Sequence, residues 1–174
     1  LVNSVRRLFN PPVTSTAVRN IASELVDFSP CEIKDYVYTT LPYRYDWETY
    51  GMPWYFPTLE EALQLGEGDC KSRYLLFASL MEELDIPYEK RISFTHIWVY
   101  YEGKPDTALE NELETLLVVD ESGKHIIQLP RPDLQRALRS FYRGFWEVMP
   151  GERKMMLLTG IIFLPISSVF PRKK

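Results

Sequence analysis

The chain is poor in the residues that build metal centres and disulfide scaffolds. Its 174 residues include two cysteines, Cys31 and Cys70, and two histidines, His96 and His125. A four-ligand zinc site would need nearly all of them, and no C-x-x-C or H-x-x-x-H spacing is present. Two cysteines are also too few for the disulfide framework of a small secreted domain. The sequence therefore predicts no metal and no other cofactor, and it favours chemistry that needs one thiol and one imidazole.

The composition is that of an ordinary folded domain, but the charges are distributed unevenly. Hydrophobic residues make up 45% of the chain and charged residues 25%, which excludes a disordered or fibrous protein. Residues 21–130 carry 21 acidic and 8 basic side chains, whereas residues 131–174 carry 9 basic and 3 acidic ones. An acidic centre lacks the single basic face that nucleic-acid binding requires, so we expect no nucleic-acid partner. The basic ends predict contact with an anionic membrane through residues 1–12 and 131–174.

Start and stop signals divide the chain into three parts. Residues 1–13 form a short basic amphipathic arm, residues 14–130 form the core, and residues 131–174 form a basic amphipathic helix followed by a hydrophobic tail. We expect an α+β core in which helices pack on an antiparallel sheet. The expected helices span about residues 15–28, 29–41, 58–66 and 70–84, and the expected strands span residues 89–94, 96–101, 116–120 and 125–129.

Two helices of the core have clear start signals, and a third has a buried character. The runs Ser29-Pro30-Cys31-Glu32 and Thr58-x-x-Glu61 are capping boxes. The helix that begins at Cys70 carries apolar residues on more than one face, so we expect it to be central and buried. We interpret Cys31 as a helical core thiol, His125 as an ordinary strand residue, and the acidic stretch 106–114 as a solvated insertion between strands.

The C-terminal part combines a helix stripe with a long uncharged run. Residues 133–147 show apolar side chains at helical spacing, with arginines on the opposite side. Residues 155–170 are 16 uncharged residues interrupted by Pro165. At about 1.5 Å per residue they form roughly 24 Å of helix, which is shorter than the hydrocarbon core of about 30 Å. Two interpretations stay open: a membrane-seated or re-entrant hairpin, and a hydrophobic tail buried against the core.

Cys70 stands where a thiol nucleophile is expected. It follows a Gly-x-Gly-Asp turn and begins the buried helix. Exposed N–H groups and the positive end of the helix dipole favour the thiolate there. Gly66 and Gly68 let the backbone approach a substrate closely, and the Cys70 N–H could line an oxyanion hole beside Gly68 and Asp69. An isolated cysteine at a helix start is more often structural, so the interpretation depends on a partner base.

His96 is the expected partner base. It opens the apolar strand 96–101, and imidazole at neutral pH can take the thiol proton and return it to a leaving amine. A third group must orient the ring. Asp120, which ends the strand 116–120, is the first candidate, although an aspartate at that place can also serve the following turn. Asp106, in the polar insertion, is the second candidate.

The segment 43–57 is rich in aromatic side chains and is broken by Gly51 and Pro53. It is expected to be a loop, and two interpretations stay open: packing on the core, and one wall of a substrate cleft. In the second interpretation Trp47 and Trp54 line the cleft.

The motifs taken together resemble the transglutaminase-like superfamily. The matching runs are T-L-E-E-A-L at 58–63, G-x-G-D-C at 66–70, L-D-I-P at 84–87 and H-x-W-V at 96–99, followed by Asp120. The similarity covers about residues 20–130. It implies a papain-like core with a Cys-His-Asp triad. In that triad Cys70 is the nucleophile, His96 the general base and acid, and Asp120 the orienting acid.

The resemblance has two further consequences. Such enzymes often complete the oxyanion hole with an upstream aromatic residue, for which Trp47, Trp54 and Tyr45 are the candidates. Asp85 stands where the family often has glycine, at a helix end where aspartate tolerates a left-handed conformation.

The function expected from these residues is acyl transfer through a cysteine thioester. The substrate would be a peptide or protein amide, hydrolysed by a cysteine peptidase or amidase, or passed to an amine by a transamidase. The alternative is a catalytically inactive transglutaminase-like domain that acts as a membrane-associated protein-interaction module. A reactive thiol without a disulfide partner suggests a cytoplasmic or membrane-associated protein.

Overall fold

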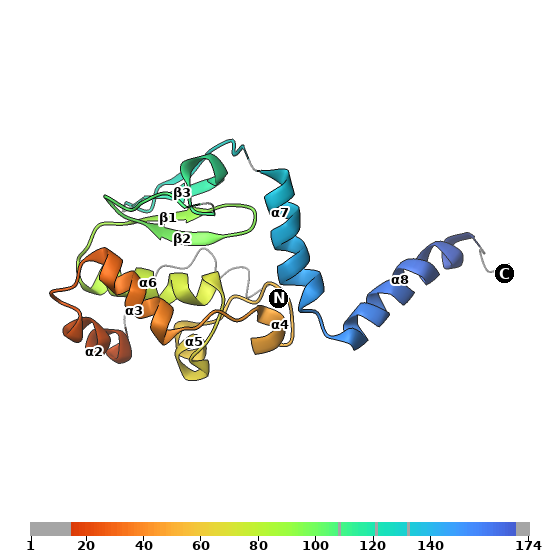
Figure 1. Ribbon diagram of the computed structural model, residues 1–174, viewed down its shortest axis with the longest axis horizontal. Helices are drawn as coiled ribbons and strands as arrows, with labels where there is room; N and C mark the ends of the chain where they lie inside the picture. Colours follow the sequence, from red (N-terminus) through yellow and green to blue (C-terminus); the bar gives the residue numbers. More distant parts are fainter. Residues whose placement is uncertain (1–14, 108, 121, 132, 170–174) are drawn as a thin grey trace.

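The structure, a computed structural model, describes residues 15–107, 109–120, 122–131 and 133–169, with side chains up to residue 161. The predicted arm, residues 1–13, lies outside the described residues. The fold is α+β, as predicted, with the helices that precede the sheet in the chain grouped on one side of a four-stranded antiparallel sheet (Figure 1). The helices are α2 (Thr16–Glu24), α3 (Pro30–Thr40), α4 (Asp46–Thr49), α5 (Leu59–Leu65), α6 (Cys70–Glu83), α7 (Leu134–Phe141) and α8 (Gly151–Val169), with the short 3₁₀ helix η1 (Glu112–Glu114) and the π-helix η2 (Tyr142–Glu147). The strands are β1 (Glu89–Ile92), β2 (Ile97–Tyr100), β3 (Leu117–Val119) and β4 (His125–Ile127).

The two predicted capping boxes are present. The Ser29 hydroxyl accepts a hydrogen bond from the Glu32 N–H, and the Glu32 carboxylate accepts one from the Ser29 N–H at 2.7 Å. Thr58 and Glu61 make the same reciprocal pair at 3.1 and 2.6 Å. Gly66 ends α5 with a φ of 66°, a left-handed conformation that glycine adopts without a Cβ penalty. These local signals therefore define α3 and α5 as the sequence predicted.

Helix α6 is the central element of the fold. Helices α2, α3 and α5 pack against it, and strand β2 packs against another of its faces. Leu76, Ala78, Leu80 and Met81 have no exposed surface, which confirms the prediction of a central buried helix. Beyond its end lies Asp85, whose φ of 52° is a left-handed conformation that aspartate tolerates at a helix end.

The strand order of the sheet is β2-β1-β3-β4, and every neighbouring pair is antiparallel. Because β1 pairs with both β2 and β3, these two strands run in the same direction on opposite sides of β1. Ile92 lies opposite Ile97 on one side and opposite Leu117 on the other. The first residues of β2 and β3 therefore lie at the same end of the sheet, and their last residues lie at the other end.

The C-terminal helices pack on the aromatic loop before they leave the core. The ring of Trp54 stacks on that of Phe145 at a centroid distance of 5.2 Å, and Trp47 contacts the same ring at 6.2 Å. Met149, just beyond η2, is buried. Helix α8 then extends away from the rest of the molecule (Figure 1). Within the described part of the chain, no helix has both the length and the apolar character needed to cross a membrane.

Two side chains differ in burial from the prediction. Cys31 is helical but exposed, because α3 turns Ile33 and Val37 toward the core, and a residue two positions before Ile33 points about 200° away from it. Glu110 belongs to the acidic stretch predicted to be solvated, yet it is only 7% exposed.

Candidate active site

Cys70 is the first residue of α6. The Asp69 carboxylate caps this helix by accepting a hydrogen bond from the Lys71 N–H at 2.9 Å. The Cys70 N–H has no acceptor within the helix, since first-turn amides never have one, and the cap does not use it. A half-buried thiol therefore lies beside a free amide donor and the positive end of the central helix.

The turn that precedes the thiol is held by backbone pairing with the end of the α3–α4 connection. The Gly68 N–H donates to the Pro42 carbonyl at 3.1 Å, and the Arg44 N–H donates to the Gly68 carbonyl at 2.9 Å. A Cβ at Gly68 would collide with the Ser72 side chain, so only glycine fits this close approach. The pairing also fixes the position of Tyr43, which forms a β-bridge with Gly68.

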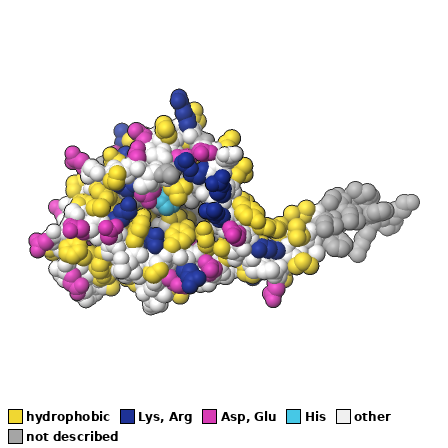
Figure 2. Space-filling view, viewed as in Figure 1, with side chains coloured by type: hydrophobic (Ala, Val, Ile, Leu, Met, Phe, Trp, Pro, Cys, Tyr) yellow, Lys and Arg dark blue, Asp and Glu magenta, His cyan; other side chains and the backbone are white. Residues whose placement is uncertain are grey.

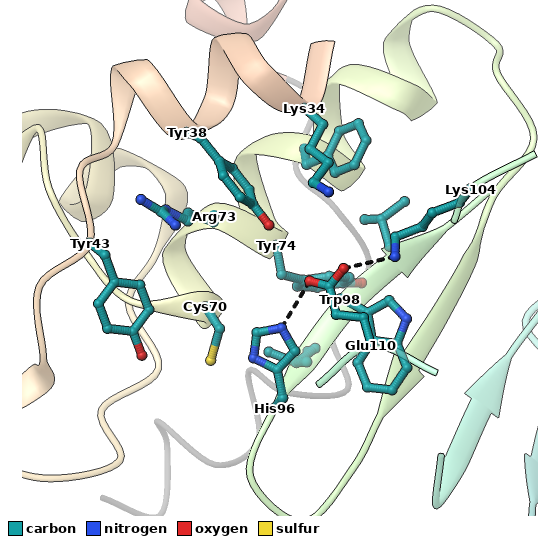
Figure 3. A pocket seen from close by; sticks show the side chains of 13 residues that line it. Lys34, Tyr38, Tyr43, Cys70, Arg73, Tyr74, His96, Trp98, Lys104 and Glu110 are labelled. Carbon is teal, nitrogen blue, oxygen red and sulfur yellow. Dashed lines mark hydrogen bonds and ion pairs between the residues drawn. The ribbon is translucent and has the colours of Figure 1, made fainter. Parts of the chain in front are cut away.

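His96 lies in the turn directly before β2. The Ser93 N–H donates to the His96 carbonyl at 2.8 Å, and the His96 N–H donates to the Ser93 hydroxyl at 3.1 Å. The imidazole stacks on Trp98 at a centroid distance of 5.8 Å. Because β2 packs against α6, the ring lies beside the Cys70 thiol, and both line a small cavity (Figure 3). The structure thus brings together the thiol and the imidazole that the sequence predicted.

A buried carboxylate holds the far side of the imidazole. His96 Nε2 lies 3.0 Å from Glu110 Oε1, and Lys104 Nζ lies 2.7 Å from Glu110 Oε2 (Figure 3). The Lys104 and Glu110 side chains are 3% and 8% exposed. Each carboxylate oxygen therefore has one cationic or donor partner, and the arrangement fixes the plane of the ring.

The environment favours a charged imidazole and a charged carboxylate. Burial lowers the pKa of His96, but hydrogen bonds and charge interactions with Cys70 and Glu110 outweigh burial and raise this pKa to about 9. Burial raises the pKa of Glu110, but hydrogen bonds and attraction from His96 and Lys104 outweigh it and lower this pKa to about 2. The geometry therefore suits an imidazolium held between the Cys70 sulfur and the Glu110 carboxylate.

Asp120, the predicted orienting acid, does not contact His96. It lies at the end of β3, whereas His96 lies before the start of β2, on the other side of β1 and at the opposite end of the sheet. Its carboxylate instead accepts hydrogen bonds from the N–H groups of Ser122 and Lys124, both at 2.9 Å, in the β3–β4 turn. Asp106, the second candidate, is exposed. Glu110 occupies the place that the prediction gave to an aspartate.

The predicted cleft residues also differ from expectation. Trp47 and Trp54 face the C-terminal helices and do not line the cavity beside Cys70. Gly68 shapes the turn and Asp69 caps the helix, and neither residue lines the cavity. Of the aromatic segment 43–57, Tyr43 lines the cavity, beside Cys70 and His96.

The cavity beside Cys70 has a volume of about 40 Å³ and is formed between α3, α6 and β2. Its aromatic wall includes Tyr38 and Tyr43, whose rings lie on either side of the Arg73 guanidinium at 4.3 and 5.3 Å (Figure 3). The full lining consists of Lys34, Tyr38, Tyr43, Cys70, Arg73, Tyr74, Phe77, His96, Ile97, Trp98, Val99, Lys104 and Glu110.

A buried ionic cluster lies behind the helix cap that precedes Cys70. Lys71 is almost fully buried and pairs with Asp69 and with Asp46, whose Oδ2 lies 2.8 Å from Lys71 Nζ. Burial raises the pKa of Asp46 to about 6, with repulsion from Asp69 adding to it and Lys71 opposing it. The Tyr55 N–H donates to the same Asp46 oxygen at 2.9 Å. This cluster ties α4 and the aromatic loop to the start of α6.

Sequence reasoning missed the carboxylate and the cations of this site for an identifiable reason. Glu110 stands in an acidic stretch in which no motif distinguishes it from its neighbours. The only signal is the single basic residue of the preceding turn, Lys104, which can neutralise one acid of the stretch.

Among the described residues, no group of three or more metal-ligand side chains is found. Comparison with protein-family models and with curated proteins found no match for this chain.

Proposed function

We propose that the protein is a transglutaminase-like thiol enzyme that acts on amide bonds through a Cys70 thioester. The observation that carries the proposal is the arrangement of three side chains: the His96 ring faces the Cys70 thiol and its Nε2 lies 3.0 Å from Glu110. The papain-like core and the superfamily assignment rest on the G-x-G-D-C and H-x-W-V motifs. The helix that begins at Cys70 and packs on the strand after His96 supports that assignment.

The reaction begins with a thiolate–imidazolium pair. The Cys70 thiolate attacks the amide carbonyl carbon, and the carbonyl oxygen takes the negative charge near the Cys70 N–H. The C–N bond then breaks, and the His96 imidazolium gives its proton to the leaving amine. The product of this half-reaction is an acyl thioester on Cys70 and a neutral imidazole.

The second half-reaction returns the enzyme to its starting state. Neutral His96 takes a proton from water, the hydroxide attacks the thioester carbon, and the carboxylic acid leaves as the thiolate re-forms. An amine in place of water would give transamidation by the same steps. Hydrolysis is the simpler outcome, because water is always present.

Glu110 and Lys104 position the imidazole. A carboxylate that stays ionised down to about pH 2 keeps one acceptor on the ring across the working range. The Lys104 ammonium occupies the other oxygen, so the carboxylate cannot rotate away. Glu110 is thus a positioning residue that acts through His96.

The thiol pair is tested by alkylation with iodoacetamide at pH 6, read at each cysteine by peptide mass spectrometry. Cys31 is an internal control, since it is exposed, lies at the second position of α3 and so shares the helix dipole. We expect Cys70 to react at least about tenfold faster than Cys31, and the His96→Ala variant to remove the difference. The His125→Ala variant, which alters a strand residue, should leave both rates unchanged. Equal rates at the two cysteines in the wild type would contradict the proposal.

The acyl transfer itself is tested with p-nitrophenyl acetate. We expect one equivalent of nitrophenolate in a burst and an acetyl mass increase on the Cys70 peptide that hydroxylamine removes. The Cys31→Ser variant should retain the burst, and the Cys70→Ser variant should lose it. A burst that survives in Cys70→Ser refutes the assignment of the nucleophile.

The C-terminal helices favour a second function, attachment to an anionic membrane. Leu134 and Leu138 of α7 are 72% and 69% exposed, and Arg139 is exposed in the same helix. Figure 2 shows basic side chains and hydrophobic surface together on this part of the molecule. An exposed apolar stripe beside basic residues is the pattern of helices that lie in the membrane interface.

Sedimentation with vesicles tests this second function. We expect binding to phosphatidylserine vesicles, weaker binding to phosphatidylcholine vesicles, and loss of binding in a Leu134→Glu, Leu138→Glu variant. An Arg19→Gln variant, altered at the opposite end of the core, serves as control. Equal sedimentation of the double variant and the wild type would show that α7 does not bind the membrane.

A further inference from the structure

Basic side chains dominate the charged lining of the cavity beside Cys70. Lys34 comes from α3, Arg73 from α6 and Lys104 from the connection after β2 (Figure 3). Glu110 is the one carboxylate among the lining residues that the structure describes. Its two oxygens are occupied by His96 and Lys104, so it leaves the other cations of the cavity uncompensated.

Arg73 and Lys34 have no carboxylate partner within the described part of the chain, since the ion pairs found there involve other cations. Three acids lie close to Cys70 in the sequence or the fold, but Asp46 and Asp69 bind Lys71 and Glu67 binds Arg44. None of the three lines the cavity. The cavity therefore offers positive charge that no side chain of the described residues neutralises.

Arg73 is held ready to bind an anion. Its Nε donates to the Leu41 carbonyl at 2.9 Å, and the guanidinium lies over the rings of Tyr38 and Tyr43. These contacts fix the side chain while they leave its terminal nitrogens for a ligand. A planar guanidinium held in this way suits a carboxylate, which it can bind through two parallel hydrogen bonds.

Arg73 and the thiol belong to the same helix. Cys70 and Arg73 are three residues apart on α6 and so lie on one face of the helix, about 5 Å apart along its axis. The cavity of about 40 Å³ has room for a few water-sized groups, each of which needs about 10–15 Å³, and it is partly open to solvent. A carboxylate on a short aliphatic chain fits a cavity of this size.

We propose that this cavity selects an acyl donor that carries a carboxylate near its scissile carbonyl, as an aspartyl or glutamyl acyl group does. The proposal rests on the thiol-dependent acyl transfer proposed for the same site, and it names the class of substrate. Arg73 and Lys34 are the residues that determine this specificity. Lys104 is already paired and acts through Glu110.

The test compares iodoacetate with iodoacetamide as alkylating agents of Cys70. The two reagents differ in one group, a carboxylate against a neutral amide, and each loses iodide to the thiolate by the same step. We measure the ratio of their rates at low ionic strength in the Cys31→Ser protein, and divide it by the same ratio for N-acetylcysteine amide. We expect a normalised ratio of about 10 or more, which falls toward 1 in high salt because screening weakens the attraction.

Variants assign the effect to residues. Arg73→Gln and Lys34→Gln should each lower the normalised ratio by about threefold or more. A change in the thiolate fraction affects both reagents equally, so it cancels in this ratio. Lys34 is only half-buried, so its variant keeps the test open if Arg73→Gln fails to fold. Arg19→Gln removes one surface cation away from the cavity lining and should not change the ratio.

The two reagents separate failure of this inference from failure of the proposed function. A fast iodoacetamide reaction with a normalised ratio at or below 1 overturns the anionic-substrate inference and leaves the thiol chemistry intact. A slow iodoacetamide reaction counts against the proposed function, and the ratio of the slow rates still reports the charge of the cavity. A high ratio that survives in both Arg73→Gln and Lys34→Gln would refute the assignment of specificity to these residues.

Discussion

Replacing Glu110 with glutamine should destabilise the protein by leaving Lys104 without a counter-charge. The Lys104 side chain is 3% exposed and its ammonium lies 2.7 Å from Glu110. Removal of one partner of a buried ion pair costs about 3–5 kcal/mol, because an uncompensated charge stays in the interior. For a domain of this size, that loss lowers the melting temperature by roughly 6–20 °C. Thermal unfolding followed by circular dichroism measures the shift.

A second variant separates this loss of charge balance from a loss of packing. The Glu110→Gln, Lys104→Met double variant removes both charges, so it should recover most of the melting temperature that Glu110→Gln loses. It should not recover catalysis, because the His96 ring would still lack its ionised acceptor. A melting temperature of Glu110→Gln within about 2 °C of the wild type, or no recovery in the double variant, would refute the reasoning.

The pH dependence of the same experiment has a definite sign. The pKa of His96 is raised from 6.5 to about 9, so its stabilising charge is fully present below pH 6.5 and is lost as the pH rises through about 9. The pKa of Glu110 is lowered from 4.5 to about 2, so its contribution is complete above pH 4.5 and is lost as the pH falls through about 2. The difference in melting temperature between wild type and Glu110→Gln is therefore largest between pH 4.5 and 6.5.

Three further substitutions test the assignment of residues around the site. Asp120→Asn should leave the alkylation rate of the nucleophile unchanged, because its exposed carboxylate serves the β3–β4 turn; a loss of about tenfold or more would restore Asp120 as the orienting acid. Gly68→Ala should lower stability by about 1–3 kcal/mol in urea unfolding, and Ser72→Gly in the same chain should recover part of the loss; equal stability of Gly68→Ala and wild type would contradict the collision. Trp54→Ala should lower the melting temperature by a few degrees through the lost stacking on Phe145 and leave burst kinetics unchanged; a lost burst would place Trp54 in the cleft.

Local signals in the sequence were sufficient for most elements of the core and for one half of the site, although α4 lies in the segment 43–57 that was expected to be a loop. The capping boxes of α3 and α5 depend on residues three apart, so the chain alone shows them. The burial of α6 follows from apolar residues on more than one face, and the left-handed Asp85 follows from its place at the helix end. Cys70 and His96 could be paired because each is tied to an element, one to a helix start and one to a strand start.

The rest of the site depends on contacts that local patterns do not encode. The choice of Asp120 assumed that β2 and β3 are neighbours, but β1 lies between them. Glu110 comes from an irregular connection whose path is decided by its tertiary contacts with His96 and Lys104. From the sequence, Trp47 and Trp54 could equally line a cleft or pack on the core. Only their contacts with Phe145 in η2 decide between these two interpretations.

We infer that His96 is held as a cation between Cys70 and Glu110. Titration of the His96 ring measures this charge directly. We would follow the His96 ring resonances by NMR from pH 5 to 10 in the wild type and in Cys70→Ser, with His125→Gln used to assign the signals. We expect a His96 pKa of about 9 in the wild type and a lower pKa in Cys70→Ser, because the interaction with Cys70 is removed. A wild-type His96 that titrates at or below 6.5, or one that titrates identically in Cys70→Ser, would contradict this inference.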